Sequence, residues 1–266
     1  MLKDITLGQY FPGETVVHRL DPRTKLTMTL VYIVALFLAK NWFSYALMAI
    51  LLICMVRLSK IGTRTLLRSL RPVFVIILFT AVLNLFFTPG EVVLRVWFLK
   101  LTREGLVTGA RMALRLTLLI AGTFLLTYTT SPLALTDGIE SIMNPLKKIR
   151  FPAHELAMMM SIALRFIPTL IEETDKIMSA QKARGADFDT GGLIKRARAM
   201  LPILVPLFIS AFRRADELAE AMESRCYHGG EGRTRMKKLG MEPRDYLALL
   251  TGAASVAAVL LVNLLP

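Results

Sequence analysis

Five uncharged, apolar runs limit what this 266-residue chain can fold into more than any other feature. They are residues 26–39, 41–56, 72–90, 116–136 and 246–266, and none of them contains Asp or Glu. A membrane hydrocarbon core about 30 Å thick needs about 20 residues of helix to cross it and leaves no backbone polar group to water. With a hydrophobic fraction of 54%, the runs predict an all-α membrane protein with about five transmembrane helices. The first two runs are short for a span.

Charges between the runs predict the orientation. The second and third runs are separated by five basic residues and no acid: Arg57, Lys60, Arg64, Arg68 and Arg71. Cytoplasmic loops of membrane proteins carry such an excess of Lys and Arg. By alternation, the N-terminus and the charged block near residues 131–245 are then cytoplasmic as well. Residues 91–115 disagree, because they should lie outside yet hold five basic residues against two acids.

The charged block contains fifteen of the twenty acidic residues, between Asp137 and Asp245, and so predicts a polar surface. Turn signals divide it into three helices. The first begins at Ser131-Pro132 and is interrupted at Asn144-Pro145, the second runs from Pro152 to Gly185, and the third follows Asp189-Thr190 and runs to about Gly229. The second and third, about 30 and 35 residues long, would reach well over 40 Å. Their apolar stretches, 156–164 and 200–212, are too short or too interrupted to cross a bilayer alone and predict interfacial or packed helices.

Both long helices are amphipathic. The third carries an apolar stripe at three-and-four spacing, made of Leu204, Leu207, Phe208, Ala211, Ala215, Leu218, Ala219 and Met222. The second carries a weaker one, made of Leu170, Thr174, Ile177, Met178 and Gln181. Charged residues, Glu173 and Arg214 among them, fill the other faces.

Each stripe ends at an arginine between small residues. The triplets are Ala183-Arg184-Gly185 and Ser224-Arg225-Cys226. A guanidinium is a planar fork of donors suited to bidentate pairing with a carboxylate, which lysine does not reproduce. For either helix alone, an ordinary C-terminal arginine favoured by the helix dipole is the alternative. Two such ends on two long helices favour a docking role.

With these motifs the sequence resembles the transmembrane subunits of energy-coupling factor (ECF) transporters, the EcfT family. The resemblance rests on the two Arg triplets, the opening HRLDPRTKL at residues 18–26 and the run ALRFIPTLIEE at residues 163–173. It covers nearly the whole chain in order and spacing. It implies a coupling subunit of an ATP-driven importer of vitamins or other micronutrients in a prokaryotic cell membrane.

The resemblance also implies the partners. In that family the two Arg triplets end coupling helices that dock into two ATP-hydrolysing subunits, a role that carries over to Ala183, Arg184 and Gly185 and to Ser224, Arg225 and Cys226. The second triplet departs from the common A-R-G form. A separate substrate-binding membrane subunit is implied as well, with Met158, Met159, Ile162, Pro202 and Pro206 as its expected contacts. Soft methionines fit an exchangeable surface, and gap-filling core methionines are the alternative.

Other residues favour a non-catalytic chain without a cofactor. The chain contains no G-x-x-x-x-G-K-[ST] motif, so ATP binding is expected in partner subunits. Three scattered histidines and two distant cysteines predict no metal site. The net charge of +13 lies beside apolar runs, where anionic lipid headgroups account for it, so nucleic acid is not an expected partner. A self-sufficient carrier or channel and a membrane-embedded enzyme remain as alternatives.

These predictions divide the chain into three parts. Residues 1–130 form a membrane domain with four transmembrane helices, and residues 131–242 form a cytoplasmic coupling domain of three helices. Residues 243–266 form a C-terminal transmembrane helix. A Gly105-x-x-x-Gly109 spacing at the edge of the fourth span is interpreted as helix packing.

Overall fold

The computed structural model describes residues 10–96, 99–149, 151–186, 188, 192–229 and 239–264. Contacts divide this described chain into two units. The first unit holds residues 10–141 together with 239–264, and the second holds residues 142–229. The C-terminal helix therefore packs with the N-terminal helices, although the whole second unit separates them in sequence.

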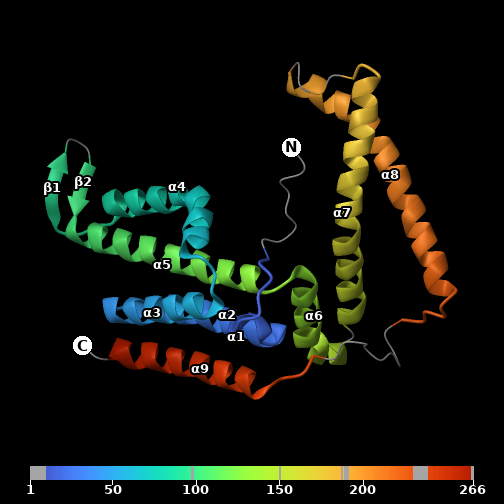
Figure 1. Cartoon of the computed structure of the whole chain (residues 1–266). Helices are drawn as coiled ribbons and strands as arrows, with labels where there is room; N and C mark the ends of the chain where they lie inside the picture. The colour runs from blue at the N-terminus through green and yellow to red at the C-terminus, as the bar shows by residue number, and fades with distance from the viewer. Residues whose placement is uncertain are drawn as a thin grey trace. The chain divides into compact units, whose positions relative to one another are not determined.

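The first unit is a helical bundle. Its helices are α1 (Val16–Arg19), α2 (Pro22–Leu38), α3 (Trp42–Ser59), α4 (Thr63–Phe87), α5 (Arg103–Thr129), most of α6 (Pro132–Met143) and α9 (Pro243–Leu264). Figure 1 shows α2, α3, α5 and α9 running alongside one another. The opening motif starts α2, because the Asp21 side chain accepts a hydrogen bond from the Arg23 amide at 2.9 Å and Pro22 takes the first helical position.

Five helices in the described chain are long and apolar enough to cross a membrane: α3, α4, α5, α7 (Ala153–Ala183) and α9. The expected number of about five, and an all-α membrane protein, are confirmed, but the set differs from the predicted one. The first predicted run lies in α2, which has only 17 residues. In its place α7 qualifies by length and composition, since its first half contains only Glu155 and Arg165 as charged residues.

A β-hairpin between α4 and α5 was not predicted. Strands β1 (Val92–Val96) and β2 (Leu99–Thr102) pair antiparallel, with Val96 opposite Leu99. The sequence predicts a loop over residues 91–115. Helix α5 instead starts at Arg103, where the Thr102 hydroxyl accepts a hydrogen bond from the Gly105 amide at 3.1 Å.

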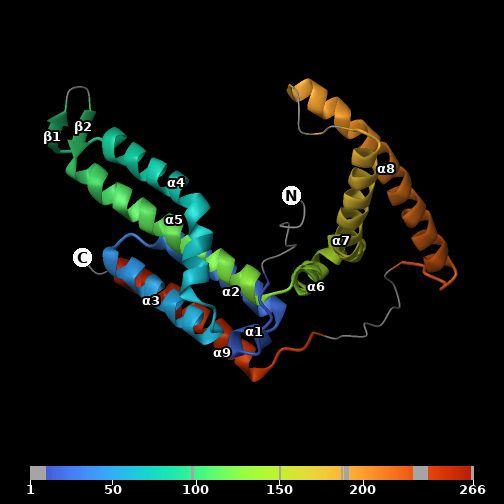
Figure 2. The same ribbon diagram turned by 45° about the horizontal axis from the view of Figure 1, so that its top comes forward.

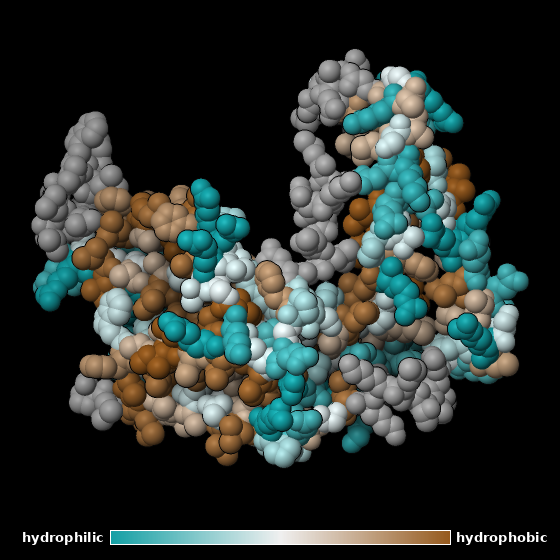
Figure 3. Space-filling view, in the orientation of Figure 1, coloured by the Kyte–Doolittle hydropathy of each residue, from teal (hydrophilic) through white to brown (hydrophobic). Residues whose placement is uncertain are grey.

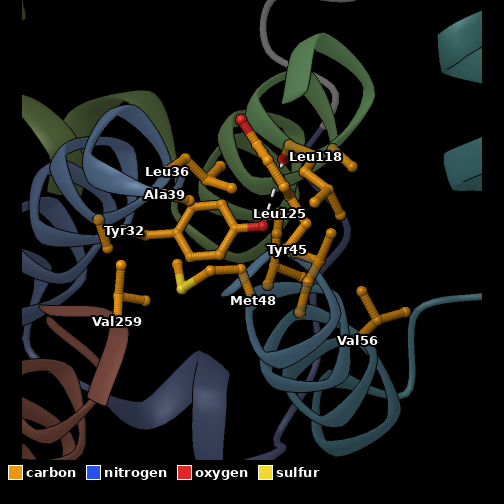
Figure 4. Close-up of a cluster of buried hydrophobic side chains, with 12 residues drawn as sticks. Tyr32, Leu36, Ala39, Tyr45, Met48, Val56, Leu118, Leu125 and Val259 are labelled. Carbon is orange, nitrogen blue, oxygen red and sulfur yellow. Dashed lines mark hydrogen bonds between the residues drawn. The ribbon is translucent and has the colours of Figure 1, made fainter. Parts of the chain in front are cut away.

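The core of the first unit lies between α2, α3, α5 and α9. Figure 4 shows Tyr32 in its centre, with Met48 of α3 and Val259 of α9 beside it. The Tyr32 hydroxyl donates a hydrogen bond to the Leu118 carbonyl of α5 at 3.5 Å. Gly122 of α5 faces the same ring, and a Cβ atom there would lie 2.7 Å from it. Close packing of this kind holds membrane helices together, because lipid tails remove the usual hydrophobic driving force between them.

Gly105 and Gly109 allow α5 to approach α4. A Cβ atom on Gly105 would lie 2.7 Å from the Leu85 carbonyl oxygen, and one on Gly109 would lie 3.0 Å from that of Ala81. The packing interpretation of this glycine spacing is therefore confirmed. These two positions fix α5 against the second half of α4.

A buried polar cluster ties the bundle together at the end where α2 begins. The Asp245 carboxylate of α9 is 2% exposed and accepts hydrogen bonds from the amides of Asp21 and Glu242, at 2.8 and 2.9 Å. The Lys25 ammonium donates to the carbonyls of His18 and Thr129, at 2.9 and 2.8 Å. The motif at residues 18–26 thus joins α2 to α5 and α9.

A second polar cluster lies at the opposite end of α2. Arg111 and Arg115 of α5 donate to the carbonyls of Lys40 and Ala39, at 3.2 and 3.1 Å. Asn263 of α9 donates to the Leu38 carbonyl at 2.7 Å. The excess of basic residues in 91–115 disagrees with the predicted orientation. These hydrogen bonds explain part of it, because Arg111 and Arg115 cap the C-terminal end of α2.

The second unit contains η2 (Asn144–Ile149), α7 (Ala153–Ala183) and α8 (Leu193–Glu223). The predicted start at Pro152 and end near Gly185 are confirmed for α7, as is the interruption at Asn144-Pro145. Residues 189–190, the predicted start signal for α8, lie outside the described residues. Figures 1 and 2 show α7 and α8 crossing, with their C-terminal ends at opposite ends of the pair. Each has 31 residues, which corresponds to about 46 Å of helix.

Candidate functional site

The end of α7 places Arg184 at a tight helix terminus. The Gly185 amide donates to the Lys182 carbonyl at 3.0 Å, and the Ala186 amide reaches back to the Gln181 carbonyl at 3.0 Å. Gly185 has φ +89°, the left-handed conformation that glycine adopts without a Cβ penalty. This pair of hydrogen bonds is the Schellman pattern, which satisfies carbonyls that the helix itself leaves unpaired.

The end of α8 repeats this pattern residue for residue. The Cys226 amide donates to the Glu223 carbonyl at 2.8 Å, and the Tyr227 amide donates to the Met222 carbonyl at 3.1 Å. Cys226 takes the left-handed position with φ 55°. Arg225 therefore stands where Arg184 stands in α7, directly before the left-handed residue. Helix α8 ends well before the predicted stop at Gly229, because Cys226 closes it.

Both arginine triplets are exposed. All six residues, Ala183, Arg184, Gly185, Ser224, Arg225 and Cys226, are exposed. No described residue forms an ion pair with either arginine. The neighbouring residues are small and the Schellman bonds fix the backbone, so both guanidinium groups are accessible on the described surface.

A polar contact joins α7 to α8 between these two ends. The Glu173 carboxylate accepts hydrogen bonds from the Ser210 hydroxyl at 2.6 Å and from the Arg214 guanidinium at 2.5 Å. Nearer the end of α7, the Gln181 amide group donates to the Pro202 carbonyl at 3.4 Å. Glu173 and Arg214, predicted to lie on polar faces outside the stripes, are half-buried in this contact, which was not predicted. No periodicity of one helix could reveal the pair, because the partner lies on the other helix.

A large apolar face of the second unit is uncovered. Among the α8 side chains that the structure describes, Ile203 is the one hydrophobic residue that is buried, and it lies outside the stripe predicted from the sequence. Leu204 and Phe208, expected to be buried, are 44% and 55% exposed. The reason is that α8 contacts α7 along a narrow line, so no described residue covers most of its apolar surface. The exposed apolar residues of α8 are Ile194, Met200, Leu201, Leu204, Val205, Phe208, Ile209 and Phe212.

Of the residues expected to contact a substrate-binding subunit, Pro202 and Pro206 lie on α8, and Met158, Met159 and Ile162 lie on the first half of α7. Met159 of α7 is 55% exposed, and Pro202 and Pro206 of α8 are exposed. Met158 and Ile162 are half-buried. Figure 1 shows α8 bent in its first half, and prolines within a helix are the usual cause of such a bend. Met159 therefore does not fill a core within this unit, whereas Met158 is partly packed.

The described part of the chain has no group of three or more His, Cys, Asp or Glu side chains placed to share a metal ion. His154 lies on α7 and His18 in the first unit, where it contacts Thr15 and the Phe11 carbonyl.

Comparison with known proteins gives the same family as the motifs. Residues 13–236 match the CbiQ family of cobalt transport proteins. The chain is 56% identical over 260 residues to the "Energy-coupling factor transporter transmembrane protein EcfT" of Thermosediminibacter oceani, covering 97% of this chain and 98% of that protein. It is 56% identical over 265 residues to the protein of the same name from Acidaminococcus fermentans, covering 100% of this chain and 98% of the relative.

A more distant relative matches over nearly the same length. The EcfT protein of Bacillus subtilis is 50% identical over 246 residues, which cover 92% of this chain and 93% of the relative. The matches span both units, including the two arginine ends and the motif that joins α2, α5 and α9. The chain belongs to the EcfT family, the transmembrane proteins of energy-coupling factor transporters.

Proposed function

We propose that this chain is the coupling subunit of an ATP-driven importer, in which two separate ATPase subunits bind Arg184 and Arg225. One observation carries the proposal: two long helices end in the same backbone geometry with an exposed arginine at the same position. One such end would be an ordinary helix terminus. Two equivalent ends, at opposite ends of a helix pair, suit a partner present in two similar copies.

The contact at Glu173 gives this pair a way to transmit movement. A partner that moves one arginine end displaces a helix about 46 Å long. The Glu173 carboxylate bonds Ser210 and Arg214 of the other helix, so a displacement of α7 acts on α8 near its middle. Closure of two ATPase subunits would in this way change the crossing of α7 and α8.

The uncovered apolar surface of α8 is where we place the substrate-binding membrane subunit. Phe208 and Phe212, whose ring centroids lie 6.4 Å apart, are exposed beside Leu204. Met159 adds a flexible side chain on α7. An apolar surface of this kind is stable in a complex with another apolar surface, and methionine side chains adapt to more than one shape. The importer's substrate, a vitamin or other micronutrient, would be bound by that partner subunit.

The proposed orientation follows from charge. The basic residues between α3 and α4 favour a cytoplasmic location for that end of the bundle. The start of α2 and the end of α5 lie at the same end, joined by Lys25. The N-terminus and the coupling domain of residues 131–242 are then cytoplasmic, in a prokaryotic cell membrane. ATP hydrolysis belongs to the partner subunits, and the chain itself is non-catalytic.

The test is copurification and uptake with Arg184→Glu and Arg225→Glu. Reversing a charge that pairs with a carboxylate in an interface costs about 2–5 kcal/mol, so each variant should lose the ATPase subunits and uptake while inserting normally. Lys182→Glu is the matched control, since Lys182 is exposed two residues before Arg184. Normal copurification and uptake in both arginine variants would exclude the proposal. Transport by the purified chain alone would instead favour a self-sufficient carrier.

A further inference from the structure

Five exposed cations lie close together in sequence, at the end of α3, in the turn that follows and on the first turns of α4. Arg57, Lys60, Arg64, Arg68 and Arg71 are all exposed. No described residue forms an ion pair or a side-chain hydrogen bond with any of them. The interval that holds them, residues 57–71, contains no Asp or Glu. Five unpaired cations this close repel one another, so the arrangement favours an anionic ligand.

Three of these cations lie on the first turns of α4, on the side of the helix that faces away from the bundle. Arg64, Arg68 and Arg71 follow a four-and-three spacing, so they lie on one helix face. The opposite face is attached to the bundle, since the Ser69 hydroxyl is hydrogen-bonded to the Tyr128 hydroxyl of α5. Leu66, on the attached side, packs against the core cluster. We name the segment of residues 63–71 the basic arm.

The basic arm points in another direction than the rest of its helix. Figures 1 and 2 both show α4 bent within its length, with its second part running along α5 and its first part turned away. Pro72 lies inside α4 and explains the bend, since a proline removes a backbone hydrogen bond and clashes with the preceding turn. An arm turned out of the direction of the spanning helices lies closer to the plane of the membrane surface.

The cationic face continues directly into a lipid-facing face. Beyond Pro72 the same helix exposes Phe74, Val75 and Leu78, at 59%, 69% and 51%. Leu67, between the arginines, is 65% exposed. Figure 3 shows apolar residues on the outside of this bundle. A single ligand along α4 would therefore meet guanidinium groups first and an apolar surface next.

We propose that the basic arm is a binding site for an anionic phospholipid, with the headgroup phosphate on Arg64, Arg68 and Arg71 and an acyl chain along the apolar face beyond Pro72. Arginine bonds phosphate in bidentate geometry. Clusters of four to eight basic residues beside a transmembrane helix bind anionic lipids in this way. An acidic protein surface would match the cations but not the apolar continuation of the same face. The site does not depend on the proposed coupling role.

The test counts lipids bound to the purified full-length chain. The chain is titrated in detergent with equal amounts of phosphatidylglycerol and phosphatidylcholine, and native mass spectrometry measures the apparent Kd of the first lipid of each kind. The wild-type chain should bind phosphatidylglycerol at least about fivefold more tightly than phosphatidylcholine. This factor corresponds to the attraction of about one Lys or Arg residue to an anionic lipid. The triple variant Arg64→Gln, Arg68→Gln and Arg71→Gln should lose that preference.

Two further variants make the result specific. Replacing the same three arginines with lysine should retain most of the preference, because the charge is kept. Replacing Arg95, Lys100 and Arg103 with glutamine makes the same charge change near the β-hairpin and should leave the preference intact. If the first triple variant fails to fold, Arg68→Gln alone should still weaken binding, and added salt should weaken it in the wild-type chain.

Three results would overturn the proposal. The first is equal affinity of the wild-type chain for both lipids. The second is an unchanged preference after all three glutamine substitutions. The third is displacement of the lipid by millimolar inorganic phosphate, which would assign the arm to a soluble anion. Loss of a copurifying protein from the triple variant, with its lipid preference intact, would assign the arm to that protein.

Discussion

Arg184 and Arg225 occupy equivalent positions, each one residue before the single left-handed residue that closes a long helix. Gly185 fills that position in α7 and Cys226 fills it in α8. The same two backbone hydrogen bonds follow in both helices, within 0.2 Å of each other in length. The sequence difference between the triplets therefore leaves the backbone pattern unchanged, and the arginine is the shared element of the two ends.

Cys226→Gly should stabilise the end of α8. A residue with a Cβ atom pays about 1–2 kcal/mol to adopt the left-handed conformation, whereas glycine does not. The local opening of this turn should therefore become at least about fivefold rarer, which amide hydrogen exchange at Tyr227 would measure as slower exchange. The mirror substitution Gly185→Ala should speed exchange at Ala186. Faster exchange at Tyr227 in Cys226→Gly would contradict the equivalence of the two ends.

Glu173→Gln should loosen the crossing of α7 and α8. The glutamine retains an acceptor for Ser210 but loses the charge that holds Arg214, and because the pair is partly exposed to solvent the effect should be modest. Spin labels on Cys226 and on an Ala183→Cys substitution, in a Cys54→Ser background, would report the distance between the two helix ends. Its distribution should broaden in Glu173→Gln. Glu172→Gln is the control, because Glu172 is exposed on the same helix, and an equal broadening there would exclude a specific role for Glu173.

The apolar runs predicted the bundle well because the absence of charge is a property of the sequence itself. Features that depend on a partner across space were missed. Glu173 has acidic and basic neighbours along α7, and only the position of Ser210 and Arg214 on α8 turns it inward. The hairpin was missed because a five-residue strand carries too weak a signal beside long helical runs.

The ends of the helices were also only partly predictable from the sequence. Glycine is the usual left-handed closing residue, so the sequence placed the end of α8 near Gly229. The chain uses Cys226 instead. The arginine triplets themselves were recognised from sequence, since their spacing from the amphipathic stripes needs no knowledge of the fold. Their exposure is described by the structure, and their role in docking remains a prediction.

Lys25 should make stability depend on pH above neutrality. It precedes the uncharged part of α2 and is 7% exposed, and burial lowers its pKa to about 8, partly opposed by the charges of Asp245 and Asp21. In the unfolded chain its pKa is about 10.4. Between these two values the unfolded chain binds more protons than the folded chain, so the contribution of Lys25 to the free energy of unfolding rises with pH.

The measurement compares the wild-type chain with Lys25→Met from pH 7 to 10.5. The variant should melt at a lower temperature throughout, because the carbonyls of His18 and Thr129 lose their donor. The neutral amine formed at high pH still has protons to donate, so the difference in apparent melting temperature should widen between pH 8 and 10.5. Lys60→Met, at an exposed position, should show no such trend. A difference that stays constant would show that Lys25 keeps an ordinary pKa in the folded chain, and one that narrows would show that the charges of Asp245 and Asp21 raise that pKa; either result would contradict the prediction.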